Sequence, residues 1–249
     1  MLDVGEIIYT QPEIIAKRLD VARELIKSSP NIKGPAITRL AASDLRLLFG
    51  LYDRIFLNRQ FTKEYRGQTK FSLSTRLTRT AGKTLCPQNI ARIKPEELII
   101  EIRLGTEFFF KFHEINSERS VAGIAADSAL EALQLVFEHE LCHVIEFVNF
   151  NTSNCRQARF KTLAHNLFGH TTSTHQLPTQ QKIAEQKYGF KIGDTVQFKF
   201  KDQCYEGILY RINKRATVMV KDKKGTHADK QGNRYAKYYV PLTCLKPQG

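Results

Sequence analysis

Residues 128–148 read SALEALQLVFEHELCHVIEFV, a continuous run of good helix formers without glycine or proline. Asp127 or Ser128 can cap its amino end, because their side-chain oxygens can accept hydrogen bonds from the first free backbone amides. Inside the run, residues 139–143 form the pentapeptide HELCH. Its two histidines, four residues apart, lie on one face of a helix, so both imidazoles can reach a single tetrahedral zinc ion. The stretch therefore predicts a long helix that carries a zinc site.

The residues around His139 and His143 favour a catalytic metal site. Glu140, one step round the helix, can hold a water on the metal and take its proton as the water attacks a carbonyl. Residues 136–137 and 144–145 are apolar, so they bury the helix and hold the site rigid. The alternative is two ordinary histidines, one hydrogen-bonded in the core and one exposed. We favour the zinc site, because by composition such a pentapeptide arises by chance in fewer than roughly one chain in a hundred of this length.

Two further helices and a small sheet are expected before this helix. Apolar residues recur at helical spacing in residues 12–27 and 43–56, and Ser43 is placed to cap the second of these helices. Residues 71–77 alternate apolar and polar side chains, and residues 98–104 (LIIEIRL) are short and rich in β-branched side chains, as strands are. Together these patterns predict an α+β domain with a small antiparallel sheet.

After the long helix, the sequence predicts one more helix, a linker and then a series of short strands. A helix is expected over residues 156–168, where Gly169 can take the left-handed cap, and residues 171–181, with Pro178, are expected to be a linker. Short strands are expected beyond it, at residues 195–200, 205–212, 217–220 and 235–240. We therefore predict a first domain of residues 1–180 and a small all-β domain of residues 187–249 that resembles an SH3-like or KOW-type barrel.

Three blocks of the first domain resemble the SprT-like metalloprotease family, to which Spartan belongs. They read LFGLYDRIF (residues 48–56), FSLSTRLTRTAGKT (residues 71–84) and LEALQLVFEHELCHVIEF (residues 130–147). The resemblance runs from Leu48 through His175 and covers roughly half of the chain. It implies a zincin-like αβ domain with a zinc-bound protease centre and, as in Spartan, a role in degrading proteins crosslinked to DNA.

The segment after the long helix departs from the family pattern. Related proteases complete the zinc shell with a histidine in an HGxxF segment, whereas residues 154–160 here read NCRQARF. Aligning on Phe160 puts Arg156 in the place of that histidine, and arginine stays protonated, so it offers no lone pair to a metal. Cys155, one residue earlier, can coordinate zinc as a thiolate.

Several other residues compete for the third position on the metal. We rank Cys155 first, His170 or His175 next, since both stand on a segment that could fold back, and a site without a third protein ligand last. His165 falls inside an expected helix, where a packing or surface role is favoured. Glu146, one helical turn past the motif, suits the support of a ligand better than direct coordination.

The charge of the chain indicates a polyanionic partner. Its formal net charge is +13, and from Lys187 onward there are 14 Lys and Arg against 5 Asp and Glu. Such a balance attracts nucleic acid or, with less support, an anionic membrane face. Cations and stacking rings are interleaved there, as on nucleic-acid-binding surfaces: Lys214, Arg215, Arg234, Lys237, Tyr235, Tyr238 and Tyr239. The alternative is that the tyrosines are core and the lysines are solvated, because alternation along a strand buries about half of its side chains.

The five cysteines stand singly and without a CxxC pair, which predicts reduced thiols in a cytosol-like compartment. Residues 1–9 lack the basic region and apolar core of a signal peptide, and no apolar run approaches the roughly 20 residues that span a bilayer. These features predict a cytoplasmic protein.

Taken with the resemblance, the motif predicts a zinc metallopeptidase whose substrate is a protein associated with or crosslinked to DNA. The rival interpretation is a nucleic-acid-binding protein in which the zinc is structural, and the altered third ligand gives that rival its support. The presence of Glu140 favours the peptidase over this rival, because a structural zinc site needs no general base.

Overall fold

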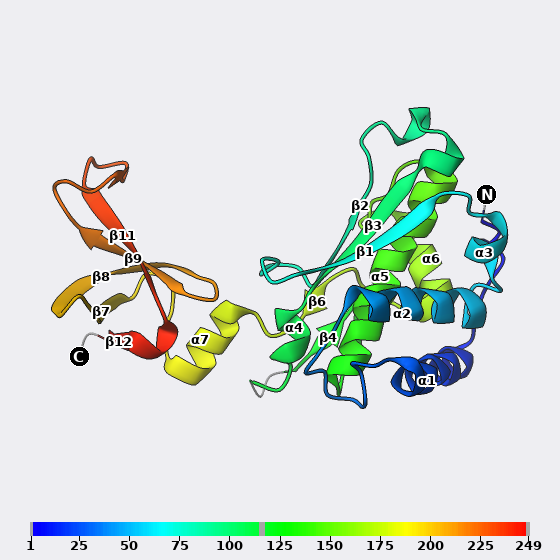
Figure 1. Ribbon diagram of the computed structural model, residues 1–249, viewed down its shortest axis with the longest axis horizontal. Coiled ribbons are helices and arrows are strands. Elements are labelled where there is room, and N and C mark those ends of the chain that lie inside the picture. The colour runs from blue at the N-terminus through cyan, green and yellow to red at the C-terminus, as the bar shows by residue number, and fades with distance from the viewer. Residues whose placement is uncertain (1, 115–117, 248–249) are drawn as a thin grey trace. The chain divides into compact units, whose positions relative to one another are not determined.

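The computed structural model describes residues 2–114 and 118–247 and has a mixed α+β architecture (Figure 1). Its two compact units divide between Leu177 and Pro178, so residues 178–180 belong to the second unit and not to the first, where the sequence-based boundary put them. The first unit contains, in chain order, α1 (Gln11–Ser28), α2 (Ala42–Ile55), α3 (Gln60–Glu64), β1 (Gln68–Ser74), β2 (Gly82–Leu85), β3 (Ile99–Gly105), α4 (Glu107–Phe110), β4 (Ser120–Val121), β5 (Ile124–Ala125), α5 (Ala129–Phe150), α6 (Ala158–Phe168) and β6 (His175–Gln176).

Helices α1 and α2 lie within one residue of their predicted bounds. Pro12 stands in the first turn of α1, where its missing amide would have no helical partner anyway. The prediction that Ser43 caps α2 was wrong, since the cap residue is Ala41. The Asp44 carboxylate accepts a hydrogen bond from the Ala41 amide at 2.7 Å, which is one half of a capping box; alanine has no side-chain acceptor for the other half.

The long helix predicted around the motif is α5, and it lies at the centre of the first unit. The Ser128 hydroxyl caps it by accepting a hydrogen bond from the Glu131 amide at 3.1 Å, as one of the two predicted caps. Its last turn ends at Asn151, which takes the left-handed conformation with φ 57°. Nearly every residue of α5 up to Glu146 is buried, so the helix is surrounded by protein rather than lying on the surface.

Strands β1, β3 and β2 form a three-stranded sheet in that order, with α5 across one face of it and α2 beside β1, while α1 packs on α2 and α5 (Figure 1). Alternate residues of β3, namely Ile100, Ile102 and Leu104, are fully buried in the core. The prediction of an antiparallel sheet was wrong for β1, which runs parallel to β3, whereas β2 is antiparallel to it. Side-chain alternation reports which face of a strand is buried and carries no information on its direction.

A second small sheet, in the order β5-β4-β6, orders part of the expected linker. His175 pairs with Val121 and Gln176 with Ser120, so residues 175–176 are a strand and not a loop. A two-residue strand has too few side chains to show a period, which is why the sequence does not reveal it.

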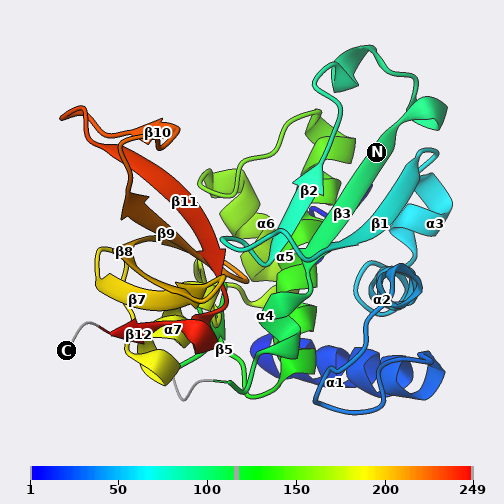
Figure 2. The same ribbon diagram turned by 60° about the vertical axis from the view of Figure 1, so that its left-hand side comes forward.

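The second unit contains α7 (Gln180–Tyr188), β7 (Thr195–Phe200), β8 (Gln203–Ile212), β9 (Ala216–Lys221), β10 (His227–Ala228), β11 (Arg234–Val240) and β12 (Lys246–Pro247). Its strands form one antiparallel sheet in the order β10-β11-β9-β8-β7-β12 (Figure 2). Within the described residues this pairing leaves β10 and β12 as edges and does not close into a ring. The core includes Ala184 of α7, Val196, Leu209 and Val218.

Helix α7 was not predicted, because residues 180–188 (QQKIAEQKY) carry few apolar side chains; its first two residues fell in the expected linker and its last two in the expected all-β domain. Ile183 and Ala184 are the buried apolar residues of this helix. Across the part of the chain that the structure describes, no helix combines the length and the apolar character that crossing a membrane requires.

Candidate metal centre

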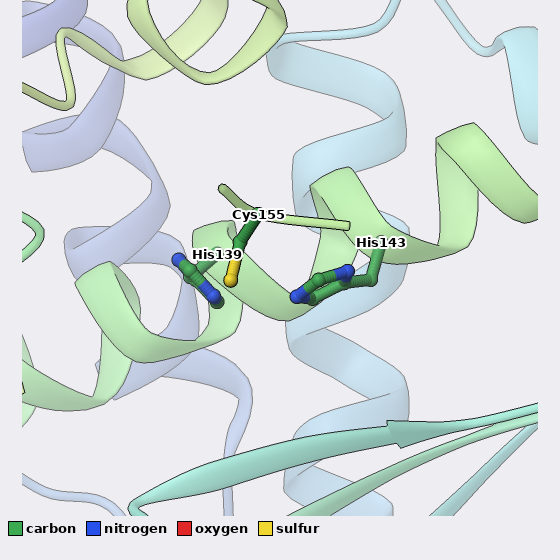
Figure 3. Close-up of side chains that lie close together, drawn as sticks. All are labelled: His139, His143 and Cys155. Carbon is green, nitrogen blue, oxygen red and sulfur yellow. The ribbon is translucent and has the colours of Figure 1, made fainter. Parts of the chain in front are cut away.

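Three side chains converge where α5 faces the loop that leads to α6. His139, His143 and Cys155 each bring one potential ligand atom to within 4.8 Å of the others, and the Cys155 side chain points toward the space between the two imidazoles (Figure 3). The two imidazole centroids are 5.0 Å apart. Nitrogen and sulfur donors at this separation are compatible with one metal ion. The structure thus brings together the three residues that the sequence singled out as ligands.

The loop that carries Cys155 is held by a buried carboxylate. Glu146, fully buried one turn past the motif, accepts hydrogen bonds from the Ser153 hydroxyl at 2.6 Å and from the Asn154 amide at 3.2 Å. Its other oxygen accepts a hydrogen bond from Arg159 Nε at 2.7 Å. Glu146 therefore fixes both ends of the turn around Cys155 and acts as a support, as its position in the sequence indicated.

The same carboxylate also orients His143. Nδ1 of His143 lies 2.6 Å from Ser153 Oγ, and that hydroxyl donates its proton to Glu146. The hydroxyl must therefore accept the proton on Nδ1, which leaves a lone pair on Nε2 for a metal. Sequence reasoning missed Ser153, because a serine after a helix carries no signal that separates a support of a ligand from an ordinary loop residue.

The two histidines are kept neutral by burial. Removal from water lowers the pKa of His139 to about 2, helped by the nearby His175 and His143, and lowers the pKa of His143 to about 4. Phe160 adds to this desolvation, with its ring centroid 4.9 Å from that of His139 and 4.6 Å from that of His143. Both imidazoles therefore keep the lone pair that metal coordination needs at neutral pH.

Glu140 is buried beside the two histidines, and within the described residues one side chain donates a hydrogen bond to it. Thr84 Oγ1 of β2 donates a hydrogen bond to Glu140 Oε2 at 2.7 Å. Burial raises the pKa of Glu140 to about 7, although the Thr84 hydrogen bond opposes the rise. A carboxylate with this pKa can accept a proton and release it again near neutral pH, as a general base must.

Strand β2 comes so close to Glu140 that one of its residues must be glycine. A Cβ atom at position 82 would lie 2.6 Å from Glu140 Oε1 and 2.7 Å from its Cγ, well inside van der Waals contact. The Glu140 side chain can keep its position beside Thr84 because Gly82 has no side chain.

We expect Gly82→Ala to push Glu140 away from Thr84 and, if the site hydrolyses peptides with Glu140 as the base, to lower kcat by roughly 10²-fold, as a misplacement of about 1 Å can do. The zinc content should stay as in the wild type, because no metal ligand is touched. Gly50→Ala in α2 is the matched control, since no heavy atom lies within 4 Å of the new methyl group. A wild-type rate for Gly82→Ala would show that the position of Glu140 does not govern hydrolysis.

A cleft of about 360 Å³ opens beside these residues. Its walls come from β2, from α5, from the Cys155 loop and from the segment before β6, and the lining residues are Thr80, Gly82, Lys83, Thr84, His139, Glu140, His143, Phe147, Ser153, Cys155, Ser173 and His175. The ligand set and Glu140 therefore face one common space that is open to a substrate.

The other candidate ligands lie elsewhere or serve other contacts. His170 is buried, and its Nε2 lies 3.0 Å from Glu138 Oε2, which also binds Arg18. His165 is exposed on α6, and Arg156 is exposed and outside the cleft.

His175 is the remaining histidine of the cleft. Its ring centroid is 4.8 Å from that of His139, its pKa is lowered to about 4 by burial, and its buried Nδ1 has no hydrogen-bond partner among the described residues. It is not one of the three residues whose ligand atoms converge within 4.8 Å.

The four basic residues singled out in the second unit do not form one cluster. Lys214 and Arg215 are exposed at the turn between β8 and β9, whereas Arg234 begins β11 beside the far end of β9. Across β9 the two ends are about 16 Å apart. Arg234 donates a hydrogen bond to the Gly225 carbonyl at 3.2 Å, and Lys237 lines a groove of the sheet.

Comparisons of the chain with protein-family models, with curated proteins and with solved structures find no match. The resemblance to SprT-like proteases therefore rests on the sequence blocks, and the function must be argued from the site itself.

Proposed function

We propose that the first unit is a zinc-dependent endopeptidase of the SprT-like type with a zincin-like fold. One observation carries the proposal: His139, His143 and Cys155 converge on one point, and Glu140, on the same helix, faces the same cleft. We further propose that the second unit is of the SH3-like type, with its sheet left open between β10 and β12, and that it holds the enzyme on nucleic acid. The substrates would then be proteins associated with or crosslinked to DNA.

The residues of the site fit zinc better than a harder cation. Two neutral imidazoles and a thiol are nitrogen and sulfur donors, which zinc accepts in tetrahedral geometry, whereas magnesium and calcium require oxygen. His139 Nδ1 is buried without a hydrogen-bond partner among the described residues. The Glu146 and Ser153 contacts to His143 match the supports that orient metal-bound histidines.

The remaining residues have the positions that peptide hydrolysis requires. When bound, zinc supplies a Lewis acid that polarises a carbonyl and acidifies water. Glu140 takes the proton of the attacking water and can deliver it to the leaving amine, because its carboxylate faces the same cleft as the three converging donors. Strand β2 is an edge of its sheet and lines the cleft, so an extended peptide can pair with its backbone beside Glu140.

A structural zinc site in a nucleic-acid-binding protein is the second candidate. The closeness of His175 to His139 favours it, because two histidines of the motif, Cys155 and His175 could together supply four ligands and leave no open position. The buried and hydrogen-bonded Glu140 favours the peptidase, since a closed site has no use for a base. Purified protein tested on a protein–DNA conjugate separates the two: cleavage that stops on metal removal supports the peptidase, and zinc without cleavage of any conjugate supports the structural site.

We expect Cys155→Ser to lower the affinity for zinc by at least about 10²-fold, because a neutral hydroxyl is a far weaker zinc ligand than a thiolate. The dissociation constant can be measured by competition with a chromogenic chelator. Cys142→Ser is the matched control: Cys142 lies between the two histidines in sequence but is fully buried and is not among the converging residues. Equal zinc affinity in the Cys155 variant and the wild type would exclude Cys155 as a ligand.

A further inference from the structure

We propose that a groove on the outer face of the second unit binds single-stranded nucleic acid, with Tyr210 as a platform on which a base stacks. The groove has a volume of about 560 Å³ and is lined entirely by residues of the second unit. The inference rests on and deepens the nucleic-acid part of the proposed function, and it does not depend on the metal centre.

Three neighbouring strands supply the floor of the groove. Ile208 of β8 pairs with Met219 of β9, which pairs with Lys237 of β11, so the three side chains form a row across the sheet. The adjacent row contains Leu209 and Val218, which are fully buried in the core, and alternation therefore turns the first row outward. Ile208 is 42% exposed. This outward row of two apolar side chains and one cation lies on the surface of the sheet and lines the groove.

A bulge in β8 directs Tyr210 to the groove. The register of β8 on β9 shifts between Leu209 and Arg211, because these residues pair with consecutive positions of β9 and leave Tyr210 without a partner. Tyr210 is 60% exposed and lines the groove. Among the described residues its ring belongs to neither hydrophobic cluster and is not packed against one, so the sheet does not need it for packing and the ring is available to a base.

A second ring on the groove is held in place by a carboxylate. The Tyr235 hydroxyl donates a hydrogen bond to Asp229 Oδ2 at 3.0 Å. Asp229 Oδ1 in turn accepts hydrogen bonds from the Gln231 and Asn233 amides, each at 2.9 Å. The Tyr235 ring is thereby fixed before any ligand arrives, which reduces the entropy lost when a base packs against it.

The charges around the two rings favour a polyanion, because two lysines line the groove against one carboxylate, Asp229. Lys230 and Lys237 line the groove, and within the described residues neither forms an ion pair. Stacking rings beside unpaired cations are the combination that binds single strands, since bases occupy the rings while the lysines meet phosphates. An acidic peptide would satisfy the lysines and leave the rings without a matching partner. A duplex keeps its bases stacked inside, so it could use the lysines alone.

The test uses the chain of 249 residues and fluorescence anisotropy of a labelled oligothymidine and of a DNA duplex of the same length, at several salt concentrations. We expect the single strand to bind more tightly, with an affinity that falls as salt rises. Tyr210→Ala should weaken single-strand binding by about 5- to 160-fold, the range found when one stacking ring is removed. Tyr210→Phe, which keeps the ring, should bind as the wild type does.

The contribution of Lys237 is measured in the same experiment. Lys237→Ala should lower the slope of log affinity against log salt by about 0.7, the value for one phosphate contact with a single strand. Lys182→Ala, an exposed lysine of α7 outside the groove, is the charge-matched control and should leave the slope nearly unchanged. Thermal unfolding of each variant shows whether the fold is intact.

Three outcomes would overturn the proposal: equal affinity for duplex and single strand, Tyr210→Ala binding as the wild type, or tight binding of polyglutamate that depends on Tyr210 and that oligothymidine does not displace. The last of these would assign the groove to an acidic peptide. Binding should be the same in Glu140→Gln, so an absence of peptidase activity leaves the groove standing, and normal hydrolysis without single-strand binding leaves the peptidase standing.

Discussion

Glu140→Gln is expected to keep the zinc and to lower peptide hydrolysis by roughly 10²- to 10⁴-fold, the usual contribution of a general base. The amide is nearly the same size as the carboxylate and can still contact Thr84, so the fold and the cleft should not change. It cannot take a proton from water, however, and the reaction loses its base. Turnover of a quenched fluorescent peptide and of a protein–DNA conjugate, measured beside the zinc content, gives the result.

The turnover rate and the zinc content together distinguish the possible outcomes. Glu140→Gln with normal zinc and a normal rate would show that another group is the base. A wild type that binds zinc and cleaves neither substrate, with or without DNA, would favour the structural site. Glu131→Gln, at the amino end of the same helix and away from the cleft, is the matched control and should hydrolyse at the wild-type rate.

His139→Ala is expected to reduce the zinc content from about one ion per chain to nearly none and to abolish hydrolysis with it. One of the three converging donors is lost, and the two that remain stand on different segments, so they cannot hold the ion tightly. Elemental analysis after dialysis against a mild chelator reports the metal, and the peptide assay reports the activity.

His165→Ala provides the control, because His165 is exposed on α6 and does not line the cleft. It should keep both zinc and activity. Zinc retained in His139→Ala would remove the basis for the metal centre and for the proposed reaction.

The sequence predicted those parts of the fold that a single period or a cap determines. Helix α5 was found because its residues favour helix throughout and Ser128 caps it, and Gly169 with φ 70° ends α6 as expected. The direction of β1 was missed because pairing depends on partners distant in sequence. Tyr210 shows the same limit: a bulge depends on the register of two strands, and neither strand alone reveals it.

The same distinction applies to the candidate site, where local sequence identifies some residues and tertiary contacts determine the contributions of others. His139 and His143 were identified because both stand on one helix with a fixed spacing, and Cys155 because it is a donor near the family's third position. The contributions of Ser153 and Gly82 come from tertiary contacts, the first with His143 and Glu146 and the second with Glu140. No local pattern in the chain encodes such contacts.

Because Glu146 holds the Cys155 loop in place, the affinity for metal depends on the fraction of molecules in which this loop is ordered. Two donors are presented by a rigid helix, but the third is on a segment that can ligate only while the Glu146 contacts to Ser153 and Asn154 hold it. If a change at Glu146 left the loop in place in about one molecule in ten, the apparent dissociation constant would rise about tenfold with all three donors intact. By linkage, zinc would shift the loop equilibrium toward its ordered form by the same factor, so a damaged support could be compensated by raising the concentration of free metal.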